Sequence, residues 1–468
     1  MTKEINRRNF LKLLGGTALA SSALLSGCKE KEKANSSSHI PQEPPVGKMT
    51  YRTNPKTGEK VSILGYGMMR LPVISERERN KQDAPIDQEM VNQQIDYALE
   101  HGMNYFDTSP AYCRGLSERA TGIALSRHPR ESYFIATKLS NFSPATWSRQ
   151  ASMEMFENSL RELQTNYVDY LLLHAIGMGN DGVQDLHNRY LDNGILDWLV
   201  EQREKGRIRN LGFSYHGDVR AFDTALQWHD EGRYHWDFVQ IELNYLDWNY
   251  ANEINPRNTD AVYLYSELQK RGIPAVIMEP LLGGRLAKVP DFIVKKMKQR
   301  EPERSVASWA FRFAGTPEGV LTVLSGMTYM EHLKDNLITY SPLKPVSEEE
   351  HQFLMDIADD IYNLNTIPCN ECNYCMPCPY GINIPAIFSH YNKCIQEGNM
   401  PNRGKQDPNY YKERQAFLVG YDRSVPRLRQ ASHCIGCREC VSHCPQRIQI
   451  PDEMHRIDRF VEELKQTD

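Results

Sequence analysis

The sequence lacks both a long apolar run and a long basic run. The apolar run from Leu11 to Leu25 is shorter than the roughly 20 residues that a membrane-spanning helix needs. Lys and Arg total 55 against 60 Asp and Glu, which leaves a formal charge of -5 and no surface typical of nucleic-acid binding. Hydrophobic residues at 40% and aromatic residues at 10% exclude a disordered chain. Because 468 residues exceed one compact core, we expect a multidomain globular protein with no nucleic-acid partner.

Residues 1–28 have the form of an export signal. A basic start (MTKEINRR) precedes the apolar run, and small residues follow it before Cys28. The stretch RRNFLK from Arg7 resembles a twin-arginine signal, and LSGC, which ends at Cys28, resembles a bacterial lipobox. This resemblance implies an exported protein on the periplasmic or cell-surface side, anchored to the membrane by a lipid on Cys28. A plain cleaved signal remains the alternative. Residues 29–48 are charged and rich in Ser and Pro, which predicts a flexible tether.

Residues 49–343 alternate short β-branched runs with longer amphipathic runs, eight times in succession. This order predicts an α/β fold, a (β/α)8 TIM barrel. An open doubly wound sheet is less favoured because no Gly-x-Gly-x-x-Gly follows the first strand. A hairpin over residues 50–64 is expected to close the bottom of the barrel. The predicted strands are Ile63–Gly67, Asn104–Thr108, Tyr133–Leu139, Val168–His174, Ile208–Tyr215, Phe238–Asn244, Pro274–Glu279 and Val320–Ser325.

Ionisable side chains gather at the ends of three consecutive predicted strands. Asp107 ends the second strand, with Tyr112 five residues later, Lys138 ends the third, and His174 ends the fourth. Because chemistry on such barrels lies at the carboxyl ends of the strands, the four should meet at one mouth. Lys138, held by Asp107, would lower the pKa of Tyr112, and His174 would orient a carbonyl oxygen. Each residue alone could be structural, but together they predict a site at which Tyr112 protonates an alkoxide.

The four residues resemble the catalytic tetrad of the aldo-keto reductases, carbonyl reductases that use NAD(P)H on a (β/α)8 barrel. The resemblance covers residues 50–343 and implies that the substrate is a small carbonyl or alcohol. It also implies that Ser214 and Gln240 contact the nicotinamide carboxamide and that Asn336 meets the adenine. Tyr215 stands where the family has Asn, and strand seven (IMEPLLGG) lacks the usual stacking aromatic. No strong clamp for a 2'-phosphate is evident, so the choice between NAD and NADP stays open.

Eight of the eleven cysteines form two dense groups within residues 344–468, where helical patterns dominate. The second group, C-x2-C-x2-C-x3-C-P, has the spacing of bacterial ferredoxins, in which the fourth thiolate binds the other cluster. The first group is one residue shorter, which leaves its fourth ligand open. Such dense spacing disfavours both zinc and disulfides. We predict a small, mainly helical ferredoxin-like domain with two [4Fe-4S] clusters, whose ligands are Cys369, Cys372, Cys375, Cys378, Cys434, Cys437, Cys440 and Cys444.

The sequence therefore predicts an exported iron-sulfur oxidoreductase of aldo-keto reductase type, with an electron-transfer partner. One difficulty is electronic, because a hydride carries two electrons, a cluster moves one, and no motif supplies the flavin or radical step that usually couples them. The clusters could instead be structural. A second hypothesis is an electron-transfer or redox-sensing protein whose barrel binds a ligand without hydride chemistry.

Overall fold

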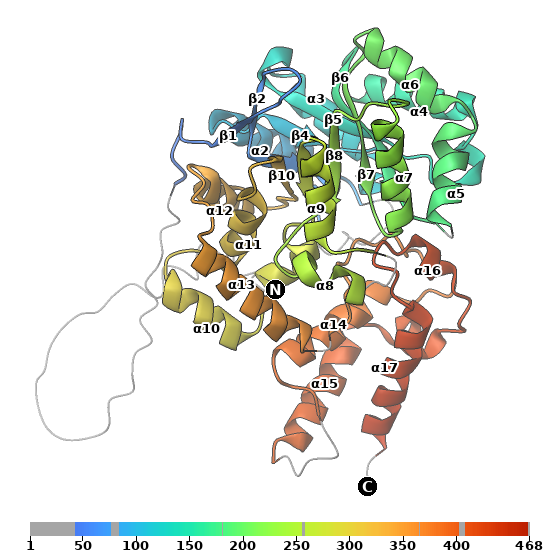
Figure 1. Cartoon of the computed structure of the whole chain (residues 1–468). Coiled ribbons are helices and arrows are strands. Elements are labelled where there is room, and N and C mark those ends of the chain that lie inside the picture. Colours follow the sequence, from blue (N-terminus) through green and yellow to red (C-terminus); the bar gives the residue numbers. More distant parts are fainter. Residues whose placement is uncertain are drawn as a thin grey trace, which may run out of the picture. The chain divides into compact units, whose positions relative to one another are not determined.

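Eight parallel strands close into a barrel, which Figure 1 shows surrounded by helices. The order around the barrel is β10-β3-β4-β5-β6-β7-β8-β9, so each strand lies beside its neighbour in the chain. Every predicted strand is present, with ends within two residues of those expected. The strands are β3 (Leu64–Gly67), β4 (Tyr105–Asp107), β5 (Phe134–Leu139), β6 (Val168–Ile176), β7 (Ile208–Tyr215), β8 (Phe238–Glu242), β9 (Ala275–Met278) and β10 (Val320–Ser325).

The computed structural model describes residues 43–75, 84–179, 181–254, 258–364, 366–401 and 408–466. The predicted signal, including Cys28, and most of the predicted tether lie outside the described residues. Of that tether, Glu43 is described, and its carboxylate accepts a hydrogen bond from the Tyr97 hydroxyl at 2.7 Å. In the described ranges, no helix combines the length and the apolar character that crossing a bilayer requires.

The predicted hairpin closes the bottom of the barrel. Its strands, β1 (Tyr51–Thr53) and β2 (Lys60–Ser62), pair antiparallel. Asn54, at the turn between them, is buried and donates a hydrogen bond from Nδ2 to the Tyr170 hydroxyl of β6 at 2.9 Å. A polar turn residue thus finds its partner inside the barrel, as a buried amide must.

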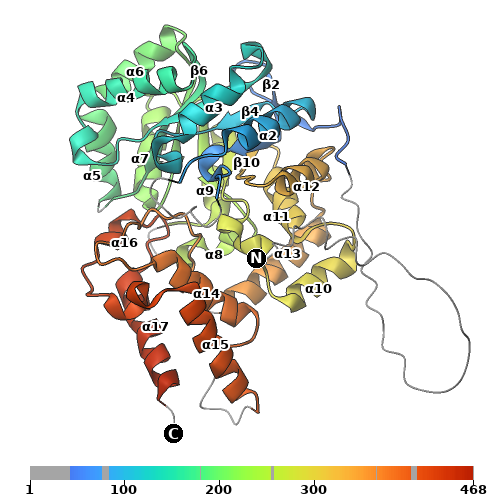
Figure 2. The same cartoon turned by 180° about the vertical axis from the view of Figure 1, so that it is seen from behind.

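The helices between the strands begin at side-chain caps that the sequence supplies. Asp87, Ser148 and Asp218 each accept a hydrogen bond from a backbone N–H in the first turn of the helix that follows. These and the other helices pack their apolar faces on the strands, and Figure 2 shows them from behind. The main ones are α2 (Gln88–Glu100), α3 (Ser117–Leu125), α4 (Arg149–Glu162), α6 (Ile195–Glu204), α7 (Val219–Asp230), α9 (Ala261–Lys270), α11 (Val306–Gly315) and α12 (Met330–Tyr340).

Helix α9 begins at Ala261, three residues after the buried Asn258. Asn258 uses its Oδ1 to accept hydrogen bonds from the Tyr215 hydroxyl, at 3.0 Å, and from the Thr259 N–H. The side chain therefore organises the loop before the helix.

The carboxyl-terminal part is helical and has an apolar core of its own. Helix α13 (Glu348–Tyr362) still belongs to the barrel, because its buried side chains join the barrel core. The second core begins at Ile367 and is built mainly by α14 (Ile384–Gln396), α15 (Tyr410–Ser424) and α17 (Ile450–Lys465). Both α14 and α17 begin with Ile-Pro, a pair suited to a first helical turn. The predicted fold class is confirmed for the barrel and for the helical domain.

Candidate active site

Lys138 and Asp107 form a buried ion pair at the mouth of the barrel. The Lys138 Nζ lies 2.5 Å from Asp107 Oδ1 and also donates to the Thr108 carbonyl at 2.9 Å. Both side chains are about 1% exposed. Burial lowers the pKa of Lys138 and raises the pKa of Asp107, while the attraction between the two groups opposes both shifts. Strand ends of β4 and β5 therefore bring together two groups predicted from separate positions in the sequence.

Tyr112 lies beside this pair, in a short turn after β4. The Lys138 Nζ is 4.8 Å from the centroid of the Tyr112 ring. Burial raises the pKa of Tyr112 well above its usual value, and the Asp107 carboxylate raises it further. The prediction of a lowered pKa for Tyr112 is wrong for the protein alone, because desolvation of the phenol dominates the shift. Tyr112 is therefore protonated at neutral pH and can act as an acid.

His174 is held by two serine hydroxyls. Its Nδ1 lies 2.5 Å from Ser140 Oγ and 3.3 Å from Ser109 Oγ. Burial and then the Lys138 charge lower the pKa of His174 well below its usual value, so the ring is neutral. When Nδ1 accepts from a serine, Nε2 carries the proton. The edge of the ring meets Tyr112 at 5.8 Å between centroids, which completes the predicted group of four.

Ser109 and Ser140 were not predicted as site residues, although their positions in the sequence point to the mouth. Each follows a predicted strand end by one or two residues, in FDTS and TKLS. They hold an imidazole whose orientation the mechanism depends on.

The predicted nicotinamide contacts lie side by side at the ends of β7 and β8. Ser214 and Gln240 are register partners, and both are buried. The Ser214 Oγ accepts from the Ala175 N–H at 2.7 Å. The Oε1 of Gln240 is buried without a hydrogen-bond partner in the described part of the chain. A buried acceptor of this kind requires a donor, and the amide of a nicotinamide supplies one, so the residues present fit this cofactor.

Asn336 lies apart from that pair, on α12. It is buried, and its Nδ2 donates to Ser325 Oγ at the end of β10 at 2.9 Å. Tyr215 turns away from the mouth, since its hydroxyl donates to the Gly217 carbonyl at 2.6 Å and its ring packs on Phe222. The Tyr that replaces the family's Asn is therefore part of the packing between β7 and α7.

Two carboxylates and a histidine complete the mouth on the side of β8 and β9. The Glu242 Oε1 lies 3.0 Å from His216 Nδ1. Glu279, with a φ of 51°, accepts a hydrogen bond from the Gly283 N–H at 2.5 Å. Burial raises the pKa of Glu279. Neither Glu242 nor His216 was predicted as a site residue, although both occupy strand-end positions like those that identified the other site residues.

The first cysteine group lies against this mouth. Arg70, after β3, donates from Nη2 to the Asn370 carbonyl at 2.8 Å. A Cβ on Gly283, after β9, would come within 2.2 Å of the same carbonyl. From the second cysteine group, Gln446 Nε2 reaches Glu242 Oε1 at 3.5 Å. Tyr374 lies near Tyr112, and burial raises the pKa of its own phenol as well. The iron-sulfur domain therefore contributes to the walls of the barrel mouth.

The eight predicted cluster ligands fall into two sets that cross between the sequence groups. Cys369, Cys372, Cys375 and Cys444 line one small cavity, together with apolar side chains of α14 and of the loop before α17. We call this the inner site. The remaining four form the outer site, in which burial, and then the neighbouring Cys378, raises the pKa of both Cys434 and Cys440.

Three thiols of one group and the fourth of the other are the donor set that a [4Fe-4S] cluster takes in two-cluster ferredoxins. In this structure Cys444 thus lies beside the first group and Cys378 beside the second. In the described part of the chain, no three His, Cys, Asp or Glu side chains converge on a single metal ion.

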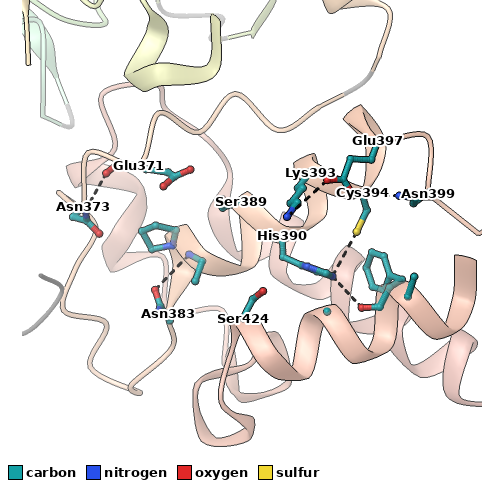
Figure 3. Close-up of a pocket in the computed structure, with 15 residues that line it drawn as sticks. Glu371, Asn373, Asn383, Ser389, His390, Lys393, Cys394, Glu397, Asn399 and Ser424 are labelled. Carbon is teal, nitrogen blue, oxygen red and sulfur yellow. Dashed lines mark hydrogen bonds and ion pairs between the residues drawn. The ribbon is translucent and has the colours of Figure 1, made fainter. Parts of the chain in front are cut away.

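A separate cavity of about 400 Å³ lies between α14 and α15 (Figure 3). His390 lines it, with Nε2 3.1 Å from the Phe417 carbonyl and 3.7 Å from Cys394 Sγ. Because the carbonyl can only accept, Nε2 carries a proton and cannot take one from the thiol. Burial raises the pKa of Cys394 to about 11. Cys394 is therefore a packed thiol rather than a nucleophile.

Comparisons with known proteins cover nearly all of the described chain. The Aldo/keto reductase family model matches residues 64–358, and the 4Fe-4S dicluster domain model matches residues 368–449. L-galactose dehydrogenase of Arabidopsis thaliana is 32% identical over 322 residues, which cover 65% of this chain and 92% of that protein. NADH-specific methylglyoxal reductase of Escherichia coli is 24% identical over 281 residues, covering 52% of this chain and 81% of that protein.

Solved structures agree on the fold. An aldo-keto reductase from Bacillus halodurans in its holo form superposes with a TM-score of 0.50 at 23% identity, covering 66% of this chain and 96% of that one. An aldo-keto reductase from Klebsiella pneumoniae in complex with NADPH has the same TM-score and coverage at 21% identity. At these identities the likeness shows the barrel fold.

Proposed function

Since the chain belongs to the aldo/keto reductase family, we propose that it transfers hydride between NAD(P) and a small carbonyl or alcohol, with two [4Fe-4S] clusters as electron carriers. The observation that carries the proposal is the buried Lys138–Asp107 pair with Tyr112 over the ammonium, at a contact of 2.5 Å and a separation of 4.8 Å. When bound, the nicotinamide supplies or accepts the hydride. Ser214 and Gln240 would hold its carboxamide, and Asn336 would meet the adenine.

In the proposed mechanism Tyr112 is the proton donor in the reducing direction. Its raised pKa keeps the hydroxyl protonated until negative charge develops on the substrate oxygen. The nearby Lys138 ammonium then stabilises the phenolate that remains. Asp107 positions the ammonium, and the neutral His174, fixed at Nδ1 by Ser140 and Ser109, donates from Nε2 to orient the carbonyl oxygen.

The substrate proposal follows the relatives and the polarity of the mouth. L-galactose dehydrogenase and methylglyoxal reductase act on a sugar and on a small dicarbonyl respectively, by their names. The buried Glu242 and the partly exposed Glu279 and His216 add hydrogen-bonding groups to the mouth of this chain. We therefore favour a polyhydroxylated carbonyl or its alcohol over an apolar aldehyde.

Each proposed cluster has its own place. The inner site is next to the mouth, since Asn370 and Tyr374 lie between or beside its ligands. The outer site includes Cys437, which is exposed. Electrons would then move between solvent and barrel through two sites in series.

Export and lipid anchoring at Cys28 are part of the same proposal. The twin-arginine route carries folded proteins, which suits a protein whose clusters are inserted before export. Replacing Arg7 and Arg8 by Lys should keep the protein in the cytoplasm, and Cys28→Ala should release it from membranes. Membrane-bound Cys28→Ala protein would contradict the anchor.

The test uses the purified holoprotein. Binding of NADH and NADPH is measured by calorimetry, turnover is measured with a panel of aldoses, sugar alcohols and small aldehydes, and iron is measured by analysis and electron paramagnetic resonance (EPR). We expect cofactor binding, turnover of at least one substrate and about eight irons per chain. Failure to bind either nicotinamide would overturn the hydride proposal and leave the redox-sensing hypothesis.

A further inference from the structure

The surface around the outer site combines exposed arginines with two exposed apolar side chains. Leu428 is 81% exposed and Ile435 is 61% exposed, which places them among the most exposed large apolar side chains of the described residues. They stand among four exposed arginines and near the exposed Cys437. We call this surface the arginine face, and it comprises Arg423, Arg427, Leu428, Arg429, Ile435 and Arg438.

The arginine face is strongly basic on a chain that is acidic overall. Residues 423–443 contain four Arg and one acidic residue, Glu439, which gives +3, whereas the whole chain carries -5. Within the described residues, no ion pair joins Arg423, Arg427 or Arg429 to a carboxylate. Arg438 alone has a partner there, Asp452, at 3.1 Å. Cations that no internal carboxylate neutralises are available to an external anionic surface.

The backbone ties this face directly to the cluster ligands. The turn Arg427–Arg429 leads through Ala431–His433 into Cys434. His433 Nε2 lies 3.1 Å from the Arg427 carbonyl, and the Cys434 N–H donates to the Ala431 carbonyl at 2.9 Å. A partner that binds the arginine face therefore lies next to the cysteines of the outer site.

We propose that the arginine face docks an acidic, one-electron carrier protein. This inference rests on the proposed function of the clusters and identifies where their partner binds. In each encounter one electron leaves the reduced carrier and is taken up at the outer site, or the reverse, and no bond is made or broken. Two such encounters would supply or remove the two electrons that, with one proton, interconvert NAD(P)+ and NAD(P)H, so the carrier would recycle the nicotinamide. Arginines steer the approach, while Leu428 and Ile435 are buried on contact, a small apolar area that suits a transient complex.

The experiment uses holoprotein and a small acidic [2Fe-2S] ferredoxin as the probe. Calorimetry at low and high ionic strength gives the affinity, and stopped-flow mixing with the reduced ferredoxin gives the rate. For the double variant Arg427→Glu with Arg429→Glu we expect the affinity and the reduction rate each to fall by at least about tenfold at low ionic strength. Both quantities should also depend less on the salt concentration. Leu428→Ser should weaken binding several-fold. The control reverses two exposed arginines of the barrel, Arg119→Glu with Arg149→Glu, and should leave both quantities unchanged.

Three outcomes would overturn the proposal. The first is unchanged ferredoxin binding in the double variant. The second is an equal slowing of reduction by dithionite, with a changed EPR signal, because the arginines would then act on the cluster itself. The third is unchanged ferredoxin binding with lost binding to phosphatidylglycerol vesicles, which would assign the face to a membrane surface. If the purified protein contained no iron, the proposed function of the clusters would be refuted instead. Calorimetry of the double variant against the parent would still show whether the arginine face binds the ferredoxin.

Discussion

The Asn370 carbonyl of the iron-sulfur domain approaches Gly283 of the barrel so closely that a Cβ there would lie 2.2 Å away. Arg70 donates to the same carbonyl from the other side, at 2.8 Å. One backbone group thus joins the loops after β3 and β9 to the first cysteine group. Glycine is required at position 283 both for this approach and for its φ of 67°.

Gly283→Ala should loosen this junction. The substitution adds backbone strain of about 1 kcal/mol or more, and the methyl group also displaces Asn370. We expect a lower unfolding temperature and faster proteolysis within the iron-sulfur domain. Gly284→Ala is the matched control, because its φ is also positive but no atom lies within 4 Å of the added carbon. Equal effects of the two changes would mean that strain alone matters at this loop.

Tyr112→Phe should abolish most of the turnover. The change removes the proposed proton donor and keeps the ring over Lys138, so kcat should fall by about 10²- to 10⁴-fold with little change in cofactor affinity. Steady-state kinetics and calorimetric binding of NAD(P)H measure the two quantities. Tyr133→Phe, a largely buried ring of the barrel, is the control. Retained turnover in Tyr112→Phe would remove Tyr112 from the mechanism.

Much of the barrel could be predicted because periodicity reports burial directly. Strand β6 is buried at all nine residues, and its sequence is correspondingly apolar from Val168 to Ile176 except at Asp169 and His174. The four site residues could be predicted for a related reason, since a polar side chain at or just after the carboxyl end of such a strand is expected to lie at the mouth of the barrel.

Contacts between segments that are far apart in the chain could not be predicted from the sequence. The contacts of Asn370 with Gly283 and of Gln446 with Glu242 join residues 87 and 204 positions apart, and no local pattern reports them. The pKa of Tyr112 depends on its desolvation and on the nearby Asp107 carboxylate, neither of which spacing encodes. The pairing of Cys378 and Cys444 with opposite groups likewise depends on how the loops fold back.

The crossed ligands predict which cysteine variants resemble each other. Cys444→Ser should damage the same cluster as Cys369→Ser, and Cys378→Ser the same cluster as Cys437→Ser, although each pair spans the two sequence groups. EPR of the reduced protein, which distinguishes two coupled clusters from one isolated cluster, checks the grouping. Cys394→Ser is the control and should change neither signal. Resemblance between Cys444→Ser and Cys437→Ser would show that the sets do not cross.

Glu118 should make stability fall as the pH rises. It is 2% exposed on α3, accepts from Thr137 Oγ1 at 2.5 Å, and burial raises its pKa to about 7 from an ordinary value near 4.5. The native state therefore binds more protons than the unfolded state between these values, so the free energy of unfolding decreases by roughly 3 kcal/mol from pH 4.5 to pH 7 through this group, and changes little above.

Glu118→Gln keeps the acceptor for Thr137 and removes the titration, so it should flatten that slope and stabilise the protein at pH 8 relative to the parent. Urea unfolding at several pH values measures the difference, with Glu89→Gln on exposed α2 surface as the control. Parallel pH profiles for Glu118→Gln and the parent would show that Glu118 is ionised in both states.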